Sequence, residues 1–333
     1  MGDWHFEQPE ENVVTIFEGI QEVGDNYNHK VDYFDSGIKI RNIQDSKIKA
    51  TAKMSKDYDH VFVVVGDNSL RYTWEGGKSF QKTAGENKAR SFLGLPGKQL
   101  DLVKSIYEIN KNLTVVYVSG KPISEPWIED NIKSIIHAWE PGSMGGKSMG
   151  KIVFGEINPS GKMPMTTARS VGQLTMVYNH KPTNYIHKYA FEKTKPLYRF
   201  GFGLSYTTFS ISKPTLSRSK WDGTGKVLVE VDVKNTGKRD GMETVQLYIR
   251  DLFSSVTRPV LELKEYKKVN VASGKTKRVS FSLSLDDFAF YDREMKYKAE
   301  KGDFNILVGN AANLSKLKKA PLELTKNIYI NEN

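Results

Sequence analysis

The feature that most constrains the fold is an unbroken apolar run, Val61–Val65, which stops at Gly66. A short β-branched run closed by glycine is typical of a strand buried on both faces, as in a parallel sheet. A long polar loop follows, and Pro96 and Gly97 then open a predicted helix with apolar positions at helical spacing, namely Leu100, Val103, Ile106 and Tyr107. In open α/β sheets ligands bind outside the carboxyl ends of the strands, so this loop is the first place to look for chemistry.

The same alternation of strand and helix continues around this run. We predict a second buried strand at Leu113–Gly120, a third short apolar strand at Ser134–Trp139, and an earlier strand at Lys30–Phe34. Short helices are expected at Asn12–Ile20, after Pro9, and at Ile48–Lys56. The stretch KPISEPWIED leads into a helical turn, and PGSMGGKSMGKIVFG is a glycine-rich turn that feeds a helix. This spacing predicts βαβ units with a largely parallel sheet, in a domain of residues 1–157.

The pattern changes near Asn158. Residues 158–212 are rich in Gly, Pro, Tyr and Phe, which predicts an ordered connector because the aromatic side chains need a surface to pack against. From Lys213 the chain alternates apolar and polar residues in short runs such as KVLVEVDVKNTG, ETVQLYIRD, RVSFSLSL and DFNILVG. About seven short strands with regular turn signals predict an immunoglobulin-like β-sandwich at residues 213–333, here without its disulfide.

Composition removes several functional classes. A charged fraction of 26% with 11% aromatics fits a globular protein, and no run approaches the roughly 18 apolar residues of a membrane span. The start, MGDWHFEQPEENVV, carries no secretory signal, and the lack of cysteine excludes disulfides and thiolate metal sites while leaving the compartment undetermined. The net charge of +10 is spread along the chain without a nucleic-acid-binding motif, so we expect a basic surface and no nucleic-acid partner.

Two sequence patterns resemble binding sites, one for a nucleotide and one for a metal ion, but neither matches the motif that such a site requires. GSMGGKS resembles a nucleotide loop, but Gly142 is followed by only three residues before Gly146, Lys147 and Ser148, where the Walker A motif requires four. A tight strand-to-helix packing turn is the simpler interpretation. The six histidines form no metal motif either, since His180 and His187 lie seven residues apart in a loop. We therefore expect no cofactor and no metal.

The loop after Val61–Val65 contains two carboxylates, Glu75 in WEGG and Glu86 in TAGENKAR. Gly85 lets the backbone turn and present Glu86, and Arg90 is close enough in sequence to pair with it. A general acid must hold a proton at the working pH, which requires partial desolvation or a neighbouring negative charge. From the residues alone, a solvated surface glutamate remains the ordinary alternative for both.

Long motifs give these residues a context. The segment HAWEPGSMGGKSMGKIVFGEINPSGKMPMTTARSVGQLTMVYNHKP, followed by PLYRFGFGLSYTTF, resembles the C-terminal half of glycoside hydrolase family 3 enzymes of the β-glucosidase type. The likeness continues through NTG and ETVQLYIRD into a fibronectin type III-like end domain. The resemblance implies a (β/α)8 barrel, an α/β three-layer sandwich and the fibronectin-like domain, in that order.

This chain has no barrel, and the resemblance places Met1–Trp4 just after the first strand of the sandwich, which is also missing. We therefore expect the chain to be the back part of a longer protein. Asp3, although followed by Trp4, is not expected to be the nucleophile.

The resemblance also assigns roles. In the family, an aspartate nucleophile comes from the barrel, and in many members an acid/base glutamate comes from a sandwich loop. GENKARSFLGLPGKQ lines up with the family loop GE-x-x-DR…LP-x-x-Q, which puts Glu86 at the acid/base position and Arg90 at the family arginine. Ala89 departs from the pattern, which has Asp there. Some members carry the acid/base in an REG-type stretch that Glu75 resembles, so Glu75 is the alternative; Arg90 and Trp74 are candidates for substrate binding.

The sequence thus predicts the C-terminal part of a retaining β-glycosidase that acts on terminal β-linked sugars and is inactive as this isolated chain. Its expected partners are a β-linked glycoside and a family 3 barrel domain, in the same parent chain or as a separate subunit. The parent protein could be periplasmic or secreted, and the sugar and linkage stay open. The alternative is a non-catalytic module that binds carbohydrate or protein.

Overall fold

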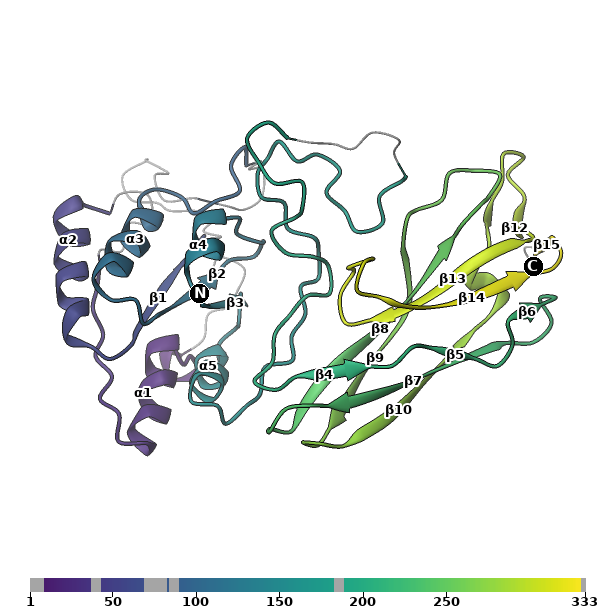
Figure 1. Cartoon of the computed structure of the whole chain (residues 1–333). Helices are drawn as coiled ribbons and strands as arrows, with labels where there is room; N and C mark the ends of the chain where they lie inside the picture. The colour runs from purple at the N-terminus through teal and green to yellow at the C-terminus, as the bar shows by residue number, and fades with distance from the viewer. Residues whose placement is uncertain (1–8, 37–42, 69–82, 84–89, 183–188, 331–333) are drawn as a thin grey trace. The chain divides into compact units, whose positions relative to one another are not determined.

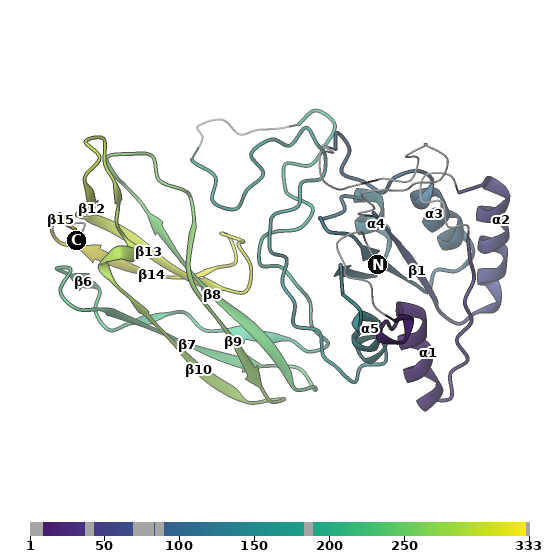
Figure 2. The ribbon, with the colours of Figure 1, turned by 180° about the vertical axis from the view of Figure 1, so that it is seen from behind.

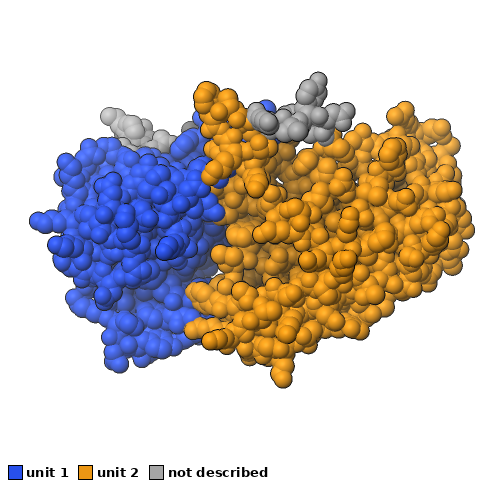
Figure 3. Space-filling view, in the orientation of Figure 1, with its two compact units in different colours: residues 1–157, 167–174 blue, residues 158–166, 175–333 orange. Residues whose placement is uncertain are grey.

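The computed structural model describes residues 9–36, 43–68, 83, 90–182 and 189–330. The chain divides into two compact units, coloured separately in Figure 3. Unit 1 comprises Met1–Ile157 and Thr167–Leu174, and unit 2 comprises Asn158–Thr166 and Thr175–Asn333. Unit 1 is a mixed α/β region and unit 2 is β-rich, and each has an apolar core of its own.

A small parallel sheet organises unit 1. Its strands are β1 (Val61–Gly66), β2 (Leu113–Val118) and β3 (Ser134–Trp139), in the order β1-β2-β3 (Figure 1). Pairing is parallel, with Val61 opposite Leu113 and Thr114 opposite Ser134. The three strands expected from the sequence are confirmed. β2 is buried as predicted, whereas Val64 of β1 is 49% exposed, so the prediction that this strand is buried on both faces is wrong. Because the strands are parallel, their carboxyl ends meet at one edge of the sheet.

The α-helices among the described residues of unit 1 pack in two groups. Helices α2 (Asp45–Met54), α3 (Gln99–Ile109) and α4 (Pro126–Asn131) share an apolar cluster with strand residues such as Val63 and Val115. Helices α1 (Ile16–Asn26) and α5 (Gly145–Val153) share a second cluster with strand residues of opposite orientation, among them Phe62 and Val116. In Figures 1 and 2 α1 and α5 lie next to each other. Short 3-10 turns occur at Glu10–Asn12, Ser55–Asp57 and Leu285–Asp287.

Helix α1 begins four residues later than the predicted Asn12 because of its N-cap. The Thr15 hydroxyl accepts a hydrogen bond from the Glu18 backbone N–H (3.2 Å), and the Glu18 carboxylate accepts one from the Thr15 N–H (2.7 Å). This reciprocal pair is a capping box, which fixes the first turn. Helix α3 likewise begins at Gln99 and not at Pro96, because Gly97 has a φ of 66°, outside the helical region.

The predicted strand at Lys30–Phe34 is wrong. These residues are described and form no strand. Val31 packs on the α1–α5 cluster, the Tyr33 ring lies 5.3 Å from the Phe17 ring, and Lys30 pairs with Asp32. The alternating pattern therefore reflects packing against α1 and not pairing in a sheet.

The described residues of unit 2 form three sheets, and the all-β pattern predicted for this part of the chain is confirmed. A four-stranded sheet has the order β10-β7-β4 with β5 beside β7, a five-stranded sheet has the order β6-β14-β13-β8-β9, and a small sheet has the order β11-β12-β15. The strands are β4 (Phe209–Ile211), β5 (Thr215–Leu216), β6 (Lys220–Trp221), β7 (Val227–Asn235), β8 (Gly241–Asp251), β9 (Glu262–Val271), β10 (Thr276–Leu283), β11 (Phe290–Tyr291), β12 (Tyr297–Ala299), β13 (Gly302–Gly309), β14 (Lys318–Leu324) and β15 (Ile328–Tyr329).

The motifs NPSGK and FGFGLSY meet in unit 2. The Met163 N–H donates to the Phe202 carbonyl (2.7 Å), and the Asn158 carboxamide oxygen accepts from the Ser205 hydroxyl (2.7 Å). Lys162 forms an ion pair with Glu243 of β8 at 2.7 Å, with only 13% and 4% of the two side chains exposed. These contacts fasten both motifs to the five-stranded sheet.

Candidate functional site

The candidate site begins where β1 ends. Gly66 lies so close to β2 that an added Cβ would be 1.8 Å from the Val118 carbonyl oxygen. Asp67 follows, and its backbone N–H donates to that same carbonyl at 3.0 Å. The Asp67 side chain is only 2% exposed. A carboxylate buried to this degree requires charged or hydrogen-bonding partners.

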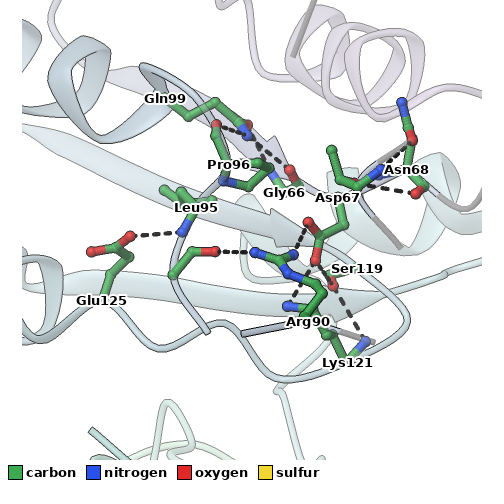
Figure 4. A network of polar contacts seen from close by, with 12 residues as sticks. Gly66, Asp67, Asn68, Arg90, Leu95, Pro96, Gln99, Ser119, Lys121 and Glu125 are labelled. Carbon is green, nitrogen blue, oxygen red and sulfur yellow. Dashed lines mark hydrogen bonds and ion pairs between the residues drawn. The ribbon is translucent and has the colours of Figure 1, made fainter. Parts of the chain in front are cut away.

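Asp67 receives three partners (Figure 4). One carboxylate oxygen lies 2.5 Å from Nη1 of Arg90, and the other lies 2.9 Å from Nζ of Lys121 and accepts a hydrogen bond from the Ser119 hydroxyl at 3.1 Å. Ser119 and Lys121 come directly after β2, so the carboxyl ends of two neighbouring strands supply the cluster. Burial lowers the pKa of Lys121, opposed by the attraction of Asp67.

The segment that returns from the loop is held at several further points. The second Nη of Arg90 donates to the Gly94 carbonyl at 2.8 Å. The Leu95 N–H donates to the buried carboxylate of Glu125 at 2.7 Å, and burial raises the pKa of that carboxyl. Gly94 is required here, because a Cβ on it would lie 2.4 Å from the Glu125 oxygen.

Gln99 closes the arrangement. Its side-chain oxygen accepts from the Gly66 N–H and its amide nitrogen donates to the Gly66 carbonyl, both at 2.9 Å. The same nitrogen donates to the Pro96 carbonyl at 3.1 Å. This explains the LP-x-x-Q part of the loop motif, since the buried glutamine satisfies backbone groups at the end of β1 and at the turn into α3.

A second contact joins the two sides of the loop. The Thr83 hydroxyl accepts from the Asn68 N–H at 2.7 Å, and the Thr83 N–H donates to the Asn68 carboxamide oxygen at 3.3 Å. Thr83 is 6% exposed. The stretch between Asp67 and Arg90 is therefore tied to the end of β1 both within its length and at its far end.

Of the site residues predicted from the sequence, some lie outside the described residues and one lies within them. Glu75, Glu86, Trp74 and Ala89 lie outside the described residues. Arg90 is described, and its guanidinium donates hydrogen bonds to the Asp67 carboxylate and the Gly94 carbonyl.

Sequence reasoning missed Asp67, Ser119, Lys121 and Glu125. A signal existed for the first three, since each follows a buried strand by no more than three residues, at the edge where parallel sheets bind ligands.

The glycine-rich turn serves packing. The Gly146 N–H at the start of α5 donates to the Val14 carbonyl at 3.1 Å, and an added Cβ on Gly146 would lie 2.0 Å from the Thr15 carbonyl oxygen. Residues that a nucleotide phosphate would have to displace thus occupy this helix start. Across the described residues there is no cluster of three metal-ligating side chains. None of the described helices is both long and apolar enough to cross a bilayer.

Comparisons with known proteins bear on this geometry. Residues 1–206 match the profile of the glycosyl hydrolase family 3 C-terminal domain, and residues 243–312 match that of a fibronectin type III-like domain. The chain belongs to glycosyl hydrolase family 3. It is 33% identical to the periplasmic β-glucosidase of Salmonella typhimurium over 97% of its own length, and 35% identical to a β-xylosidase of Formosa agariphila over 93%.

Solved structures of β-glucosidases have the same fold. A β-glucosidase from Erythrobacter marinus superposes with a TM-score of 0.83 at 30% identity and covers 94% of this chain. A β-glucosidase from Listeria innocua, in complex with isofagomine, gives 0.86 at 24% identity. The chain spans 44% of the Salmonella protein and 43% of the Erythrobacter chain. The part of each of these two proteins that matches is thus less than half of its length.

Proposed function

We propose that this chain is the C-terminal part of a retaining β-glycosidase of the β-glucosidase type, hydrolysing terminal β-linked sugars. The observation that carries the proposal is the family 3 match over residues 1–206, which spans the candidate loop and the cluster at its ends. Relatives named β-glucosidase and β-xylosidase keep the sugar open between glucosides and xylosides.

In the proposed mechanism Glu86 is the general acid/base. Its proton passes to the glycosidic oxygen while an aspartate of a barrel domain attacks the anomeric carbon, and Glu86 then takes a proton from the water that releases the sugar. The two carboxyl groups would stand about 5–5.5 Å apart. Glu86 is preferred to Glu75 because it lies four residues before Arg90, which Asp67 holds in place. Arg90 would then act through the loop, and Trp74 would contact the sugar.

The remainder of the chain would support this loop. We propose that the two helix groups of unit 1 are the outer layers of the family's three-layer sandwich, and that the fibronectin-like domain is structural. A barrel domain, in the same parent chain or as a separate subunit, would supply the nucleophile and most sugar contacts. The isolated chain is then expected to be inactive, because general acid/base catalysis, which raises the rate by about 10²–10⁴-fold, does not replace a nucleophile.

The test is a chimera in which this chain replaces the matching part of the Salmonella periplasmic β-glucosidase. We expect Glu86→Gln to lower kcat/KM for phenyl β-glucoside by about 10²–10⁴-fold, because a poor leaving group needs a proton. For dinitrophenyl β-glucoside, whose leaving group departs as an anion, kcat/KM should change little. Glu75→Gln is the matched control and should leave both values near those of the unmodified chimera.

Other outcomes have defined meanings. If Glu75→Gln gives the leaving-group signature and Glu86→Gln does not, the acid/base is Glu75. If neither variant gives it in an active chimera, the acid/base role of this loop is wrong. If the chimera folds but hydrolyses none of these glycosides or the corresponding xylosides, a non-catalytic module that binds carbohydrate or protein becomes the better explanation.

A further inference from the structure

We propose that Asp67 is a positioning residue for this reaction, holding Arg90 and with it the end of the acid/base loop. The proposal rests on the proposed function for what is positioned, and on described contacts for how. Asp67 is the first residue after β1, and its backbone is fixed to β2 through the 3.0 Å hydrogen bond to Val118. Its carboxylate is therefore a fixed point of the sheet.

The charges explain why a carboxylate is needed there. Arg90 and Lys121 approach different oxygens of Asp67, at 2.5 and 2.9 Å, and their side chains are only 15% and 26% exposed. In the part of the chain that the structure describes, Asp67 is the one anion that forms an ion pair with either of these two cations. Without its charge, two half-buried cations would repel each other across a neutral side chain. Arg90 lies outside the helices and strands, so its side chain can move away once the opposing charge is lost.

A fixed Arg90 restrains the chain on both its C-terminal and its N-terminal side. Toward its C-terminal side it donates to the Gly94 carbonyl, in the segment that Glu125 and Gln99 also hold. Toward its N-terminal side, Glu86 is the fourth residue before it. A general acid must lie within about 2.6–3.2 Å of the atom it protonates, and a displacement of about 1 Å can lower the rate 10²-fold. Because Glu86 is only four residues from Arg90 in the sequence, a fixed Arg90 limits how far Glu86 can lie from the end of β1.

Trypsin gives a direct test on the chain itself. Cleavage of the Arg90–Ser91 bond places the Arg90 guanidinium in the protease specificity pocket, so the Asp67 pair must first open. We expect Asp67→Asn to accelerate cleavage at this bond at least tenfold, and the charge-preserving Asp67→Glu to accelerate it less. Cleavage after Lys82, in the same loop, is the internal reference. Mass spectrometry of the early fragments measures both rates.

The matched control is Glu243→Gln, which breaks a similarly buried pair with Lys162 in unit 2. It should leave cleavage at Arg90–Ser91 unchanged. If Asp67→Asn cleaves at the unmodified rate, or if Glu243→Gln accelerates cleavage equally, Asp67 does not anchor Arg90 and the proposal is wrong.

The chimera tests the positioning role. Asp67→Asn should lower kcat/KM for phenyl β-glucoside at least tenfold more than for dinitrophenyl β-glucoside, with recovery in Asp67→Glu. Equal losses on both substrates would mean a merely structural role and would overturn the proposal. The two proposals fail separately. Fast cleavage in Asp67→Asn without a leaving-group signature in Glu86→Gln would support the anchoring of Arg90 by Asp67 and contradict the acid/base role of Glu86. Slow cleavage in Asp67→Asn together with that signature in Glu86→Gln would contradict the anchoring and support the acid/base role.

Discussion

At the scale of single residues, a second buried carboxylate lies far from the loop. Asp251, the last residue of β8, accepts a hydrogen bond from the Phe253 N–H on one oxygen, while its other oxygen is buried without a hydrogen-bond partner among the described residues. Burial raises its pKa to about 6, Arg258 opposes the shift and Glu300 adds to it. The folded protein thus keeps a proton on Asp251 at a pH where an unfolded chain has lost it.

This predicts a pH-dependent stability with a definite sign. The contribution of Asp251 is full below about pH 4, the ordinary pKa of an aspartate, and is lost as the pH rises through 6. Asp251→Asn should therefore match the unmodified chain at pH 4 and become more stable above pH 6, by about 1–2 kcal/mol after allowance for solvent screening. Urea unfolding between pH 4 and 8 measures this.

Asp232→Asn is the control for that series. The Asp232 side chain is partly exposed, and its hydrogen bonds from Arg278 lower its pKa, so its stabilising effect should be fully present above about pH 4 and be lost only as the pH falls below that value. A stability difference between Asp251→Asn and the unmodified chain that does not vary with pH would contradict the buried-proton account.

At the scale of elements, the contact between α1 and α5 depends on glycine. An added Cβ on Gly150 would lie 2.0 Å from the Gly19 carbonyl oxygen, and one on Gly19 would lie 1.9 Å from the Gly146 carbonyl oxygen. The two helices therefore approach backbone to backbone. Since the blocking atoms belong to helical backbone and not to a movable side chain, the contact cannot adjust without separating the helices.

Gly150→Ala is expected to destabilise unit 1 by about 1–3 kcal/mol, the usual range for overpacking, even though alanine is the better helix former. Gly172→Ala, also in unit 1, is the matched control, because its nearest neighbour would be 3.7 Å from the new Cβ. Thermal unfolding followed by circular dichroism compares the two. Equal transition temperatures in both variants would show that α1 and α5 tolerate a wider spacing.

At the scale of the whole molecule, the two units have separate cores. In unit 2, buried side chains of β7, β8 and β10 gather around Trp221, Phe281 and Phe304. In unit 1, the cores lie among the parallel strands and the two helix groups. Domains with their own cores commonly unfold as separate cooperative units.

Calorimetry should accordingly resolve two unfolding transitions. Gly150→Ala should lower the transition temperature of one, and Glu243→Gln should lower the other, because breaking the buried pair with Lys162 leaves a cation unpaired in unit 2. If either variant shifts both transitions equally, the units unfold as one and the division into separate cores has no thermodynamic meaning.

The sequence by itself determined the fold class and the family. The three apolar runs that became β1, β2 and β3, and the alternating runs that became β7, β8, β10 and β13, carry their periodicity in consecutive residues, which is why they could be predicted. The boundaries of α1 and the segment 30–34 could not be predicted as well. The start of α1 depends on the capping box at Thr15. The conformation of segment 30–34 depends on its packing against the α1–α5 cluster.

Only the tertiary structure decided what surrounds the candidate loop. Arg90, Lys121 and Asp67 are far apart in the chain, and nothing in their local sequence says that two cations share one carboxylate. The sequence suggested Arg90 as a partner of Glu86, which lies outside the described residues, and the fold shows a pairing of Arg90 with Asp67 across the end of β1. The reason is that charge pairing in a buried site is set by which strand ends meet, and parallel strands bring together residues separated by a whole crossover.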